Sequence, residues 1–500
     1  MKQKDTHDRQ QLLRREFLKG ASWLTGAVLI GQNGLISEVL GADAAGAIKS
    51  QNISGLSGTP IWRGDSAYEV ARQNAMWVGN KPNRFPSVIV FPKDEKDVAA
   101  AIKFAARNRI KVGARSGGHS WAAPHVQNGS MLIDLSAWNT AVVDAKNKTA
   151  WVQPAVRSQD FANALKPHQL AFPTGHNPDV ALGGFLLCGG FGRNSRQWGI
   201  GCQNILEVEC VNAKGELIRA TDKRNADYFW AACGGGAAVP AVVTRLKVRV
   251  YDLPKVIHQR VYVYDMQDFE TVVRWAIEVM PQLPDYVEPM VYRRRYDEAT
   301  GGWADDTIQI IAVSFGDSVE KVEAGLAPLD TCPALSRVKS KSFKDITLDQ
   351  AFERSNGVDP KGIRFAVDGM WSDADAAQLA AALKPMYETV PTPRTYIYFA
   401  MWGPVKPAAD LAMSMQARVY VAAHTRWDKP EDDARMYAWA TEHMRRLEPL
   451  SIGSKLNDDS MVRRKSRYFS QAAEQRLAAI RKRYDPDGVF QGFLELGAPV

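Results

Sequence analysis

Residues 87 to 119 alternate between strand-like and helical segments and end in a glycine pair followed by a histidine. Ser87 to Phe91 is a short apolar run, Glu95 to Asn108 carries apolar residues at helical spacing, and Lys111 to Ala114 is a second strand-like segment. The second segment continues directly into "RSGGHS", Arg115 to Ser120. This order predicts a β-α-β unit whose second strand ends in a glycine-rich turn with a single histidine.

The rest of the sequence predicts an α+β protein with two domains. Strand-like segments with turns at Asn147-Lys148 and Lys214-Gly215 continue the first domain, residues 60–255. The second domain, residues 256–455, is predicted from antiparallel strands separated by helices: "KVIHQRVYVYD", "DTIQIIAVSFGD", "RTYIYFAMWG" and "MSMQARVYVAAHTRW". A last helix, which ends at Asp485-Pro486-Asp487-Gly488, lies in a C-terminal segment, residues 456–500.

Residues 1–47 resemble a twin-arginine export signal. Arg14 and Arg15 precede a weakly apolar run that ends in small residues. The run from Ala21 to Gly31 is shorter than the ~20 residues of a membrane span, so we expect no stable membrane span in the mature form. The alternative is an amphipathic helix with an incidental arginine pair. The signal predicts the twin-arginine translocon as an export partner and a periplasmic or secreted protein, and such export favours a cofactor enzyme.

Composition excludes several classes of function. The 500 residues are 45% apolar and 24% charged, which is ordinary for a large globular enzyme. The formal charge of +8 is spread along the chain, and the densest basic cluster, Arg463 to Arg467, has little aromatic interleaving, so we expect no nucleic-acid partner. The five cysteines form no CxxC pair, so neither a disulfide framework nor a metal site is predicted.

Three glycine clusters lie in the first domain. They are Ser116-Gly117-Gly118, the pair Gly183-Gly184 with Gly189-Gly190-Phe191-Gly192, and Gly234-Gly235-Gly236. Glycine permits positive φ and a close backbone approach, and successive N–H groups can bind an anion. A cradle for a phosphate-bearing cofactor and a structural turn are both consistent with each cluster. The spacings of a Rossmann fingerprint and of a P-loop are absent.

Together and in this order the motifs resemble those of FAD-linked oxidases of the vanillyl-alcohol oxidase and para-cresol methylhydroxylase (PCMH) superfamily, most closely the berberine-bridge-enzyme-like branch. The segments that carry the resemblance are "PSVIVFPKDEKDV" (Pro86 to Val98), "RSGGHS", "AFPTGHNPDVALGGFLLCGGFGRNSRQWGIGCQNI" (Ala171 to Ile205) and "NADYFWAACGGG" (Asn225 to Gly236). The resemblance implies a two-subdomain FAD-binding domain of the PCMH type, an antiparallel-sheet substrate domain backed by helices, and a C-terminal segment that returns to the FAD domain.

The resemblance also implies the residues that bind FAD. His119 would bond covalently to the flavin 8α-methyl carbon, because a neutral imidazole nitrogen can attack an electrophilic flavin tautomer held by the same loop. The other expected cofactor-binding residues are Arg115, Ser116, Gly117, Gly118, Ser120, Gly175, Asn177, Val180, Gly183, Gly184, Gly189, Gly190, Gly192, Ile205 and Tyr468.

Three departures from the family pattern concern the flavin. Many members of the branch add a cysteinyl linkage where this sequence has Asn177, in "GHNP", so a single attachment is expected. Cys188 is not at the matching position and is interpreted as a packed thiol. In the third motif, Cys233 replaces the usual arginine, and Ala237-Ala238-Val239-Pro240 replaces "GNFG".

Oxidation of an alcohol at a flavin needs a group that accepts the hydroxyl proton. Period-2 reading of the strands places Tyr396 and Tyr398, and likewise Gln416, Arg418, Tyr420 and His424, on faces that would line a pocket; Met415, Ala417, Val419 and Val421 point the other way. A solvent-exposed face would give the same pattern. No Asp or Glu stands out, so Tyr420, Tyr398 and Tyr468 are the candidate bases, with Arg418 expected to lower a tyrosine pKa from about 10.

The leading hypothesis is an FAD-dependent oxidase that acts on a small alcohol, sugar or aromatic compound, with O2 as acceptor and H2O2 as product. Val180 lies where the family places a gate beside the flavin, and a small valine resembles the open, oxidase-like state. The alternatives are a dehydrogenase that passes electrons to a partner and a flavin-binding protein without oxidase turnover. A zinc- or nucleotide-dependent hydrolase is disfavoured because the ligand spacing is absent.

Overall fold

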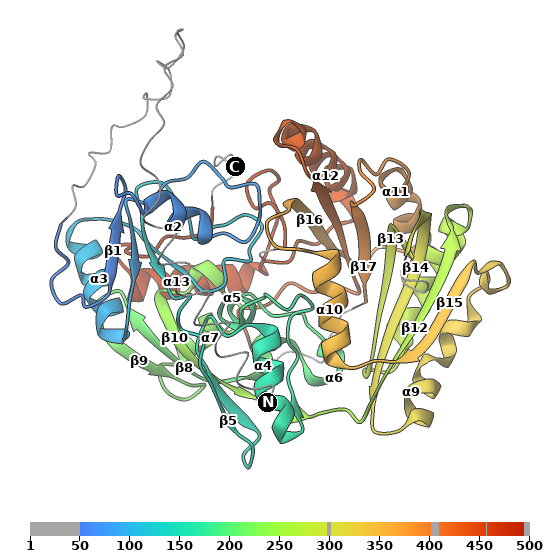
Figure 1. Cartoon of the computed structure of the whole chain (residues 1–500), viewed down its shortest axis with the longest axis horizontal. Coiled ribbons are helices and arrows are strands. Elements are labelled where there is room, and N and C mark those ends of the chain that lie inside the picture. Colours follow the sequence, from blue (N-terminus) through green and yellow to red (C-terminus); the bar gives the residue numbers. More distant parts are fainter. Residues whose placement is uncertain (1–50, 298–301, 402–409, 457, 495–500) are drawn as a thin grey trace, which may run out of the picture. The chain divides into compact units, whose positions relative to one another are not determined.

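The four-stranded sheet at the start of the fold contains the predicted β-α-β unit (Figure 1). Its order is β1-β2-β4-β3, with β2, β4 and β3 parallel and β1 antiparallel to β2. The strands are β1 Thr59–Trp62, β2 Val88–Phe91, β3 Val112–Arg115 and β4 Met131–Asp134. Helix α3, Glu95–Arg107, connects β2 to β3, and the Asp94 carboxylate caps it by accepting hydrogen bonds from two backbone N–H groups.

The computed structural model describes residues 51–297, 302–401, 410–456 and 458–494, all within a unit that begins at residue 48. The predicted export signal, residues 1–47, lies outside the described residues. Among the residues described, no helix is both long and apolar enough to cross a bilayer.

A five-stranded antiparallel sheet of order β5-β6-β10-β8-β9 completes the first half of the fold. Its strands are β5 Ala141–Asp144, β6 Thr149–Val152, β8 Ile205–Asn212, β9 Leu217–Ala220 and β10 Ala241–Arg249. A short pair follows, β7 Leu170–Ala171 with β11 Tyr251–Asp252. The helices of this half are α2 Tyr68–Asn74, α3, α4 Ser158–Leu165, α5 Leu182–Leu187, α6 Ser195–Trp198 and α7 Ala226–Ala232.

A seven-stranded antiparallel sheet of order β15-β12-β14-β13-β17-β18-β16 forms the second half. Its strands are β12 Val256–Asp265, β13 Val287–Asp297, β14 Gly302–Gly316, β15 Ser340–Asp345, β16 Arg364–Ser372, β17 Tyr396–Ala400 and β18 Val419–Trp427. Its helices are α8 Phe269–Val279, α9 Val319–Leu326, α10 Leu348–Val358, α11 Ala376–Glu388 and α12 Asp433–Leu447. The two halves give the α+β architecture predicted from sequence.

One face of this sheet packs on helices, and the other faces the first half of the fold. Alternate residues of β17 and β18, including Ile397, Phe399 and Val421, share a core with residues of α8, α9, α11 and α12. Tyr396, Tyr398 and other residues of the opposite parity share a core with residues of the first half. This alternation confirms the period-2 reading of β17 and β18.

The strand predicted at Met413 to Trp427 begins only at Val419. Met415 and Ala417, which were expected on the face opposite to Tyr420, pack in the same core as Tyr420 because they precede the strand. Five further elements, β13, β15, β16, α10 and α12, were not predicted from the sequence.

The C-terminal segment lies beside the β3 strand. After α13, Gln471–Tyr484, the Val112 N–H donates to the Val489 carbonyl at 2.8 Å, and the Gln491 N–H donates to the Val112 carbonyl at 2.9 Å. Phe490 forms a parallel bridge with Val112. The end of the chain therefore stabilises the strand from which the glycine-rich turn starts.

Candidate functional site

A cavity of about 470 Å³ lies between the glycine-rich segments of the first half and the inner face of the seven-stranded sheet. From the first half it is bordered by residues 112–121, by parts of 175–193 and by parts of 236–243. From the sheet it is bordered by side chains of β13, β14, β17 and β18, together with residues of α10 and of the loop 455–458. The three glycine clusters, which are far apart in sequence, thus converge, although the third contributes only Gly236 to the lining.

The turn after β3 requires glycine at two successive positions. A Cβ on Gly117 would lie 2.6 Å from the Ala181 Cβ, and a Cβ on Gly118 would lie 2.1 Å from the Ala75 carbonyl oxygen. Gly118 also has φ +68°, which side-chain-bearing residues rarely adopt. The turn is therefore packed against two other segments while its inner edge borders the cavity.

His119 presents a neutral, unsatisfied imidazole at this turn. Its Nε2 atom is buried and has no hydrogen-bond partner among the described residues, although the Asn177 side chain hydrogen-bonds the ring. Burial lowers the pKa of His119 to about 4, so the ring is uncharged at neutral pH. Trp77 covers the ring, with the centroids 4.3 Å apart. The ring is thus held in place and uncharged, with Nε2 unpartnered among the described residues.

Most of the predicted cofactor residues border the cavity. They are Arg115, Ser116, Gly117, Gly118, His119, Ser120, Gly175, Asn177, Val180, Gly183, Gly184 and Gly190. The guanidinium of Arg115 is engaged elsewhere, because it donates to both carboxylate oxygens of Asp134 at 2.9 Å. A phosphate contact from this segment would therefore come from the backbone of the turn.

Four predicted cofactor residues do not border the cavity. A Cβ on Gly192 would lie 2.2 Å from the Thr174 carbonyl oxygen, and Gly189 packs against the Met413 sulfur. Ile205 is buried in the core at the start of β8. The fourth is Tyr468, whose hydroxyl is hydrogen-bonded to Asp459. Gly189, Gly192 and Ile205 therefore have packing roles that motif position alone does not distinguish from cofactor contact.

The sheet supplies an aromatic surface. Tyr292 of β13 and Tyr396 and Tyr398 of β17 border the cavity, with ring centroids 5.7 to 6.2 Å apart. Met290 of β13 and His424 of β18 border it as well. Of the three candidate bases, Tyr398 alone borders the cavity, and burial raises its pKa well above the ordinary value.

The placement of Tyr420 and Tyr468 argues against both as bases. The Tyr420 hydroxyl donates to the Asp458 carboxylate at 2.9 Å, and the Tyr468 hydroxyl donates to Asp459 at 2.8 Å. Burial and these carboxylates raise the pKa of both tyrosines. The prediction that Arg418 lowers a tyrosine pKa was wrong. Its guanidinium donates a hydrogen bond to the Ala374 carbonyl, and its backbone N–H donates one to Asp373.

Three carboxylates that the sequence analysis missed border the cavity: Glu288, Asp359 and Asp458. Asp458 accepts a hydrogen bond from the Trp121 indole at 3.0 Å and pairs with Lys455 at 2.8 Å. Burial alone would raise its pKa, but the Lys455 ammonium and the Trp121 hydrogen bond help to outweigh burial, and the pKa of Asp458 lies well below the usual range. Asp458 is therefore an anion with fixed partners.

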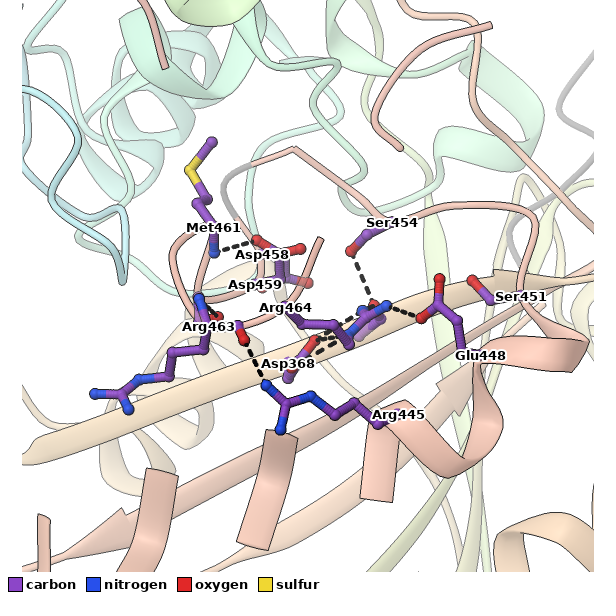
Figure 2. Close-up of polar contacts among 12 residues, drawn as sticks. Asp368, Arg445, Glu448, Ser451, Ser454, Asp458, Asp459, Met461, Arg463 and Arg464 are labelled. Atoms are coloured by element: carbon purple, nitrogen blue, oxygen red, sulfur yellow. Dashed lines mark hydrogen bonds and ion pairs between the residues drawn. The ribbon is translucent and has the colours of Figure 1, made fainter. Parts of the chain in front are cut away.

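Behind Asp458 lies a buried ionic network, shown in Figure 2. Arg464 lies between Asp368 of β16 and Glu448, and it also donates to the Gly369 carbonyl at 2.8 Å. Burial and the nearby Asp368 raise the pKa of Asp459 to about 7. This network anchors the loop 455–464, which carries Lys455 and Asp458 to the cavity.

The residues present fit FAD. The convergent glycine segments can admit a dinucleotide, and the unpartnered Nε2 of His119 offers a nitrogen for attachment. The residues that would hold the cofactor are the turn 115–120 and the segment 175–190. When bound, FAD would accept two electrons from a substrate held beneath the sheet.

The cysteines near this region are thiols. Cys188 borders the cavity, and burial raises its pKa to about 12, as expected for an unreactive packed side chain. Among the residues that the structure describes, no group of three or more His, Cys, Asp or Glu side chains is arranged to hold a metal ion.

The fold and this site define a flavin-binding protein with a substrate domain. A family model described as an FAD binding domain matches residues 86–221. The FAD-linked oxidoreductase nodO of Hypoxylon pulicicidum is 28% identical over 442 residues, which cover 87% of this chain and 97% of that protein. The match to an FAD binding domain and the similarity to FAD-linked oxidoreductases over most of the chain make this protein an FAD-dependent oxidoreductase, in agreement with the superfamily that the sequence motifs resemble.

Solved structures share the fold at low sequence identity. The 6-hydroxy-D-nicotine oxidase of Arthrobacter nicotinovorans superimposes with a TM-score of 0.76 at 22% identity, covering 88% of this chain and 98% of that chain. The Physcomitrella patens BBE-like 1 protein gives a TM-score of 0.76 at 18% identity, covering 88% and 97%. The grass pollen allergen Phl p 4 gives 0.72 at 18% identity, covering 88% and 96%.

Proposed function

We propose that this protein is an oxidase that carries FAD bonded through His119 and oxidises a small aromatic alcohol, with O2 as acceptor and H2O2 as product. The observation that carries the proposal is the buried, uncharged and unpartnered Nε2 of His119 at the edge of the cavity. An unsatisfied buried nitrogen costs about 1–3 kcal/mol, so its retention at this turn favours a role that uses the nitrogen.

The substrate class is inferred from the sheet face. Tyr292, Tyr396, Tyr398 and Met290 border the cavity and present flat or flexible apolar surface. Aromatic side chains pair well with a planar ring through offset or edge-to-face contacts. The sequence left open a small alcohol, a sugar or an aromatic compound, and this surface favours the aromatic alcohol.

The choice of O2 as acceptor rests on Val180. Its side chain borders the cavity, and a Cβ on the adjacent Gly175 would lie only 3.0 Å from the Val180 Cβ and Cγ1. A longer side chain at 180 would therefore fill space next to the glycine. Among the solved neighbours, wild-type Phl p 4 is described as a glucose dehydrogenase, and a variant with valine in place of isoleucine is described as a glucose oxidase. The corresponding alternative here is a dehydrogenase that passes electrons to a partner.

The linkage is tested with His119→Ala. The denatured wild-type chain should retain yellow flavin fluorescence on a denaturing gel and an FAD mass increment, and His119→Ala should lose both. His258→Ala is the control, because His258 lies on β12 and pairs with the exposed Asp345. If His119→Ala keeps the mass increment, the linkage is not through this histidine.

The reaction is tested by peroxide release from 4-hydroxybenzyl alcohol, glucose and 6-hydroxy-D-nicotine. Val180→Leu should slow reoxidation of the reduced flavin by O2 while leaving reduction by substrate nearly unchanged. If the wild-type reduced enzyme already reoxidises with O2 as slowly as typical dehydrogenases do, the dehydrogenase alternative replaces the oxidase.

We also propose twin-arginine export to the periplasm or outside the cell, supported by Arg14 and Arg15 in the sequence. Arg14→Lys/Arg15→Lys should leave the protein in the cytoplasm when fractions are assayed for bound flavin. Unchanged export of this variant would show that another route is used.

A further inference from the structure

His424 is a second histidine at the cavity whose ring is only partly satisfied. It lies on β18, borders the cavity and is 6% exposed. Its Nδ1 lies 2.9 Å from the Tyr396 hydroxyl oxygen, whereas its Nε2 is buried without a hydrogen-bond partner in the described part of the chain. A buried ring nitrogen without a partner points to a group that arrives with the substrate.

The Tyr396 side chain connects His424 to a carboxylate. The Tyr396 hydroxyl lies 3.3 Å from Asp359 Oδ2, and Asp359 forms an ion pair with Arg426. The rings of Tyr396 and His424 are stacked, with centroids 4.6 Å apart and 18° between planes. The Arg426 guanidinium also lies over the Tyr396 ring, with its Cζ atom 4.2 Å from the ring centroid. These contacts fix both rings in place.

The direction of the hydrogen bonds follows from this chain. If Tyr396 donates to the Asp359 carboxylate, its oxygen accepts the Nδ1 proton of His424. The neutral imidazole carries only one ring proton, so Nε2 then has a free lone pair. The carboxylate thus selects the tautomer in which Nε2 is a proton acceptor.

Burial keeps the His424 ring neutral, because it lowers the pKa of His424 to about 3. Among the charged groups near the ring, Asp458 of the neighbouring loop raises this pKa, whereas Arg426 of the same strand and Lys455 of that loop lower it. Tyr396 and Tyr398 of β17 contact the ring and are uncharged, because burial raises the pKa of both well above the ordinary value.

We propose that His424 Nε2 accepts the proton that the substrate hydroxyl loses, and that Tyr396 and Asp359 are positioning residues that set its tautomer. The proposal rests on the proposed function. The substrate carbon loses its hydrogen and two electrons to bound FAD, and the substrate oxygen loses its proton to Nε2. One C–H and one O–H bond break, one C=O bond forms, and the imidazolium returns its proton to water after the product leaves.

A weakly basic nitrogen is sufficient for this step. As the hydrogen and electrons leave the carbon, the hydroxyl becomes that of a protonated carbonyl, which is a strong acid. Nε2 therefore does not need to be strongly basic. It needs to be unprotonated and correctly placed. The Asp458 carboxylate, which lowers the energy of a nearby positive charge, favours the imidazolium while it exists.

The first test needs no substrate. In holoenzyme labelled with 15N-histidine, His424→Gln identifies the His424 signals by their loss. We expect the wild type to show protonated Nδ1 and unprotonated Nε2 across about pH 6 to 9, and Tyr396→Phe to shift the tautomer balance. If the wild type carries its proton on Nε2, that nitrogen is a donor and the proposal is overturned.

The second test is anaerobic flavin reduction by 4-hydroxybenzyl alcohol and glucose. His424→Gln should reduce about 10²- to 10⁴-fold more slowly, with unchanged covalent flavin content and nearly unchanged half-saturating substrate concentration. Tyr396→Phe should lie between His424→Gln and wild type. The control His258→Gln, remote on β12, should match wild type.

The two proposals fail in different ways. An unchanged rate in His424→Gln with either substrate overturns the role of His424 and leaves the oxidase proposal intact. If neither compound reduces the wild-type flavin, the proposed substrate class is wrong, and the tautomer measurement alone decides the role of His424.

Discussion

Replacement of Arg464 by methionine tests the network behind the cavity. The guanidinium contacts Asp368 at 2.9 Å and the Gly369 carbonyl at 2.8 Å, and it also pairs with Glu448. The side chains of Arg464 and Asp368 are 5% and 2% exposed. Water therefore cannot replace the guanidinium, and Arg464→Met leaves the Asp368 carboxylate buried without its cation. Loss of one partner of a buried ion pair costs about 3–5 kcal/mol of unfolding free energy.

The loss should depend on pH, because Asp368 can bind a proton instead of remaining charged. Burial already raises its pKa, and removal of Arg464 raises the pKa further. A group whose pKa is raised in the folded state favours folding less as pH rises from its unfolded pKa towards its folded pKa. The deficit of Arg464→Met should thus be smaller at about pH 5 than at about pH 8. Asp368→Asn/Arg464→Met should recover part of it, because the buried carboxylate is removed and the other partner of Arg464, Glu448, is 49% exposed and can be hydrated.

The assay is urea unfolding of the holoenzyme followed by tryptophan fluorescence, with refolding checked at each pH. Arg274→Met is the matched control: its pair with Glu278 on α8 is exposed, so it should cost no more than about 1 kcal/mol. The reasoning is refuted if Arg464→Met costs as little as the control at about pH 8, or if the double variant is as unstable as Arg464→Met.

Three further changes have distinct expected results. Gly118→Ala should lower the melting temperature and the flavin content together, because its Cβ would lie 2.1 Å from a carbonyl oxygen at positive φ; normal flavin loading would contradict this. Asp459→Asn should reduce the loss of melting temperature as pH rises from about 4 to 7, because the folded state binds the Asp459 proton more tightly than the unfolded state. Parallel plots of melting temperature against pH for the variant and the wild type would contradict the raised pKa of about 7. Asn177→Cys should break the contact with the His119 ring and place a thiol beside the cavity, and mass spectrometry should find a second flavin linkage; its absence would show that the geometry is unsuitable.

The cofactor turn was predictable because its determinants are local. The strand, the glycine pair and His119 lie within nine residues, and steric demand allows only glycine at 117 and 118. The aromatic face of β17 was predictable for a related reason, since alternation along one strand fixes which side chains share a face. His424 was placed on that face too, but its pairing with Tyr396 depends on register between two strands.

Glu288 was not predicted because its strand, β13, was not predicted. Asp359 and Asp458 could not be predicted, because they lie in connections between elements. Asp359 follows α10, which the sequence analysis missed, and Asp458 lies in a loop after α12. Trp121 and Asp458 are 337 residues apart, and neither shows a pattern that indicates the other. Tyr420 was predicted on the correct face of its strand. The sequence could not show that its hydroxyl donates to Asp458 while Tyr398 borders the cavity, because this difference depends on the loop that carries Asp458.

Trp121 shows why the two sides of the site form one unit. It lies two residues after His119, its indole N–H donates to Asp458, and its ring stacks on Phe365 of β16 at 4.2 Å and 16°. The same short segment therefore carries the nitrogen proposed for attachment and a contact with both the sheet and the loop 455–464. A displacement of that loop would therefore move Trp121, which lies two residues after His119. The buried ions around Arg464 thus favour a fixed spacing between the cofactor turn and the aromatic face.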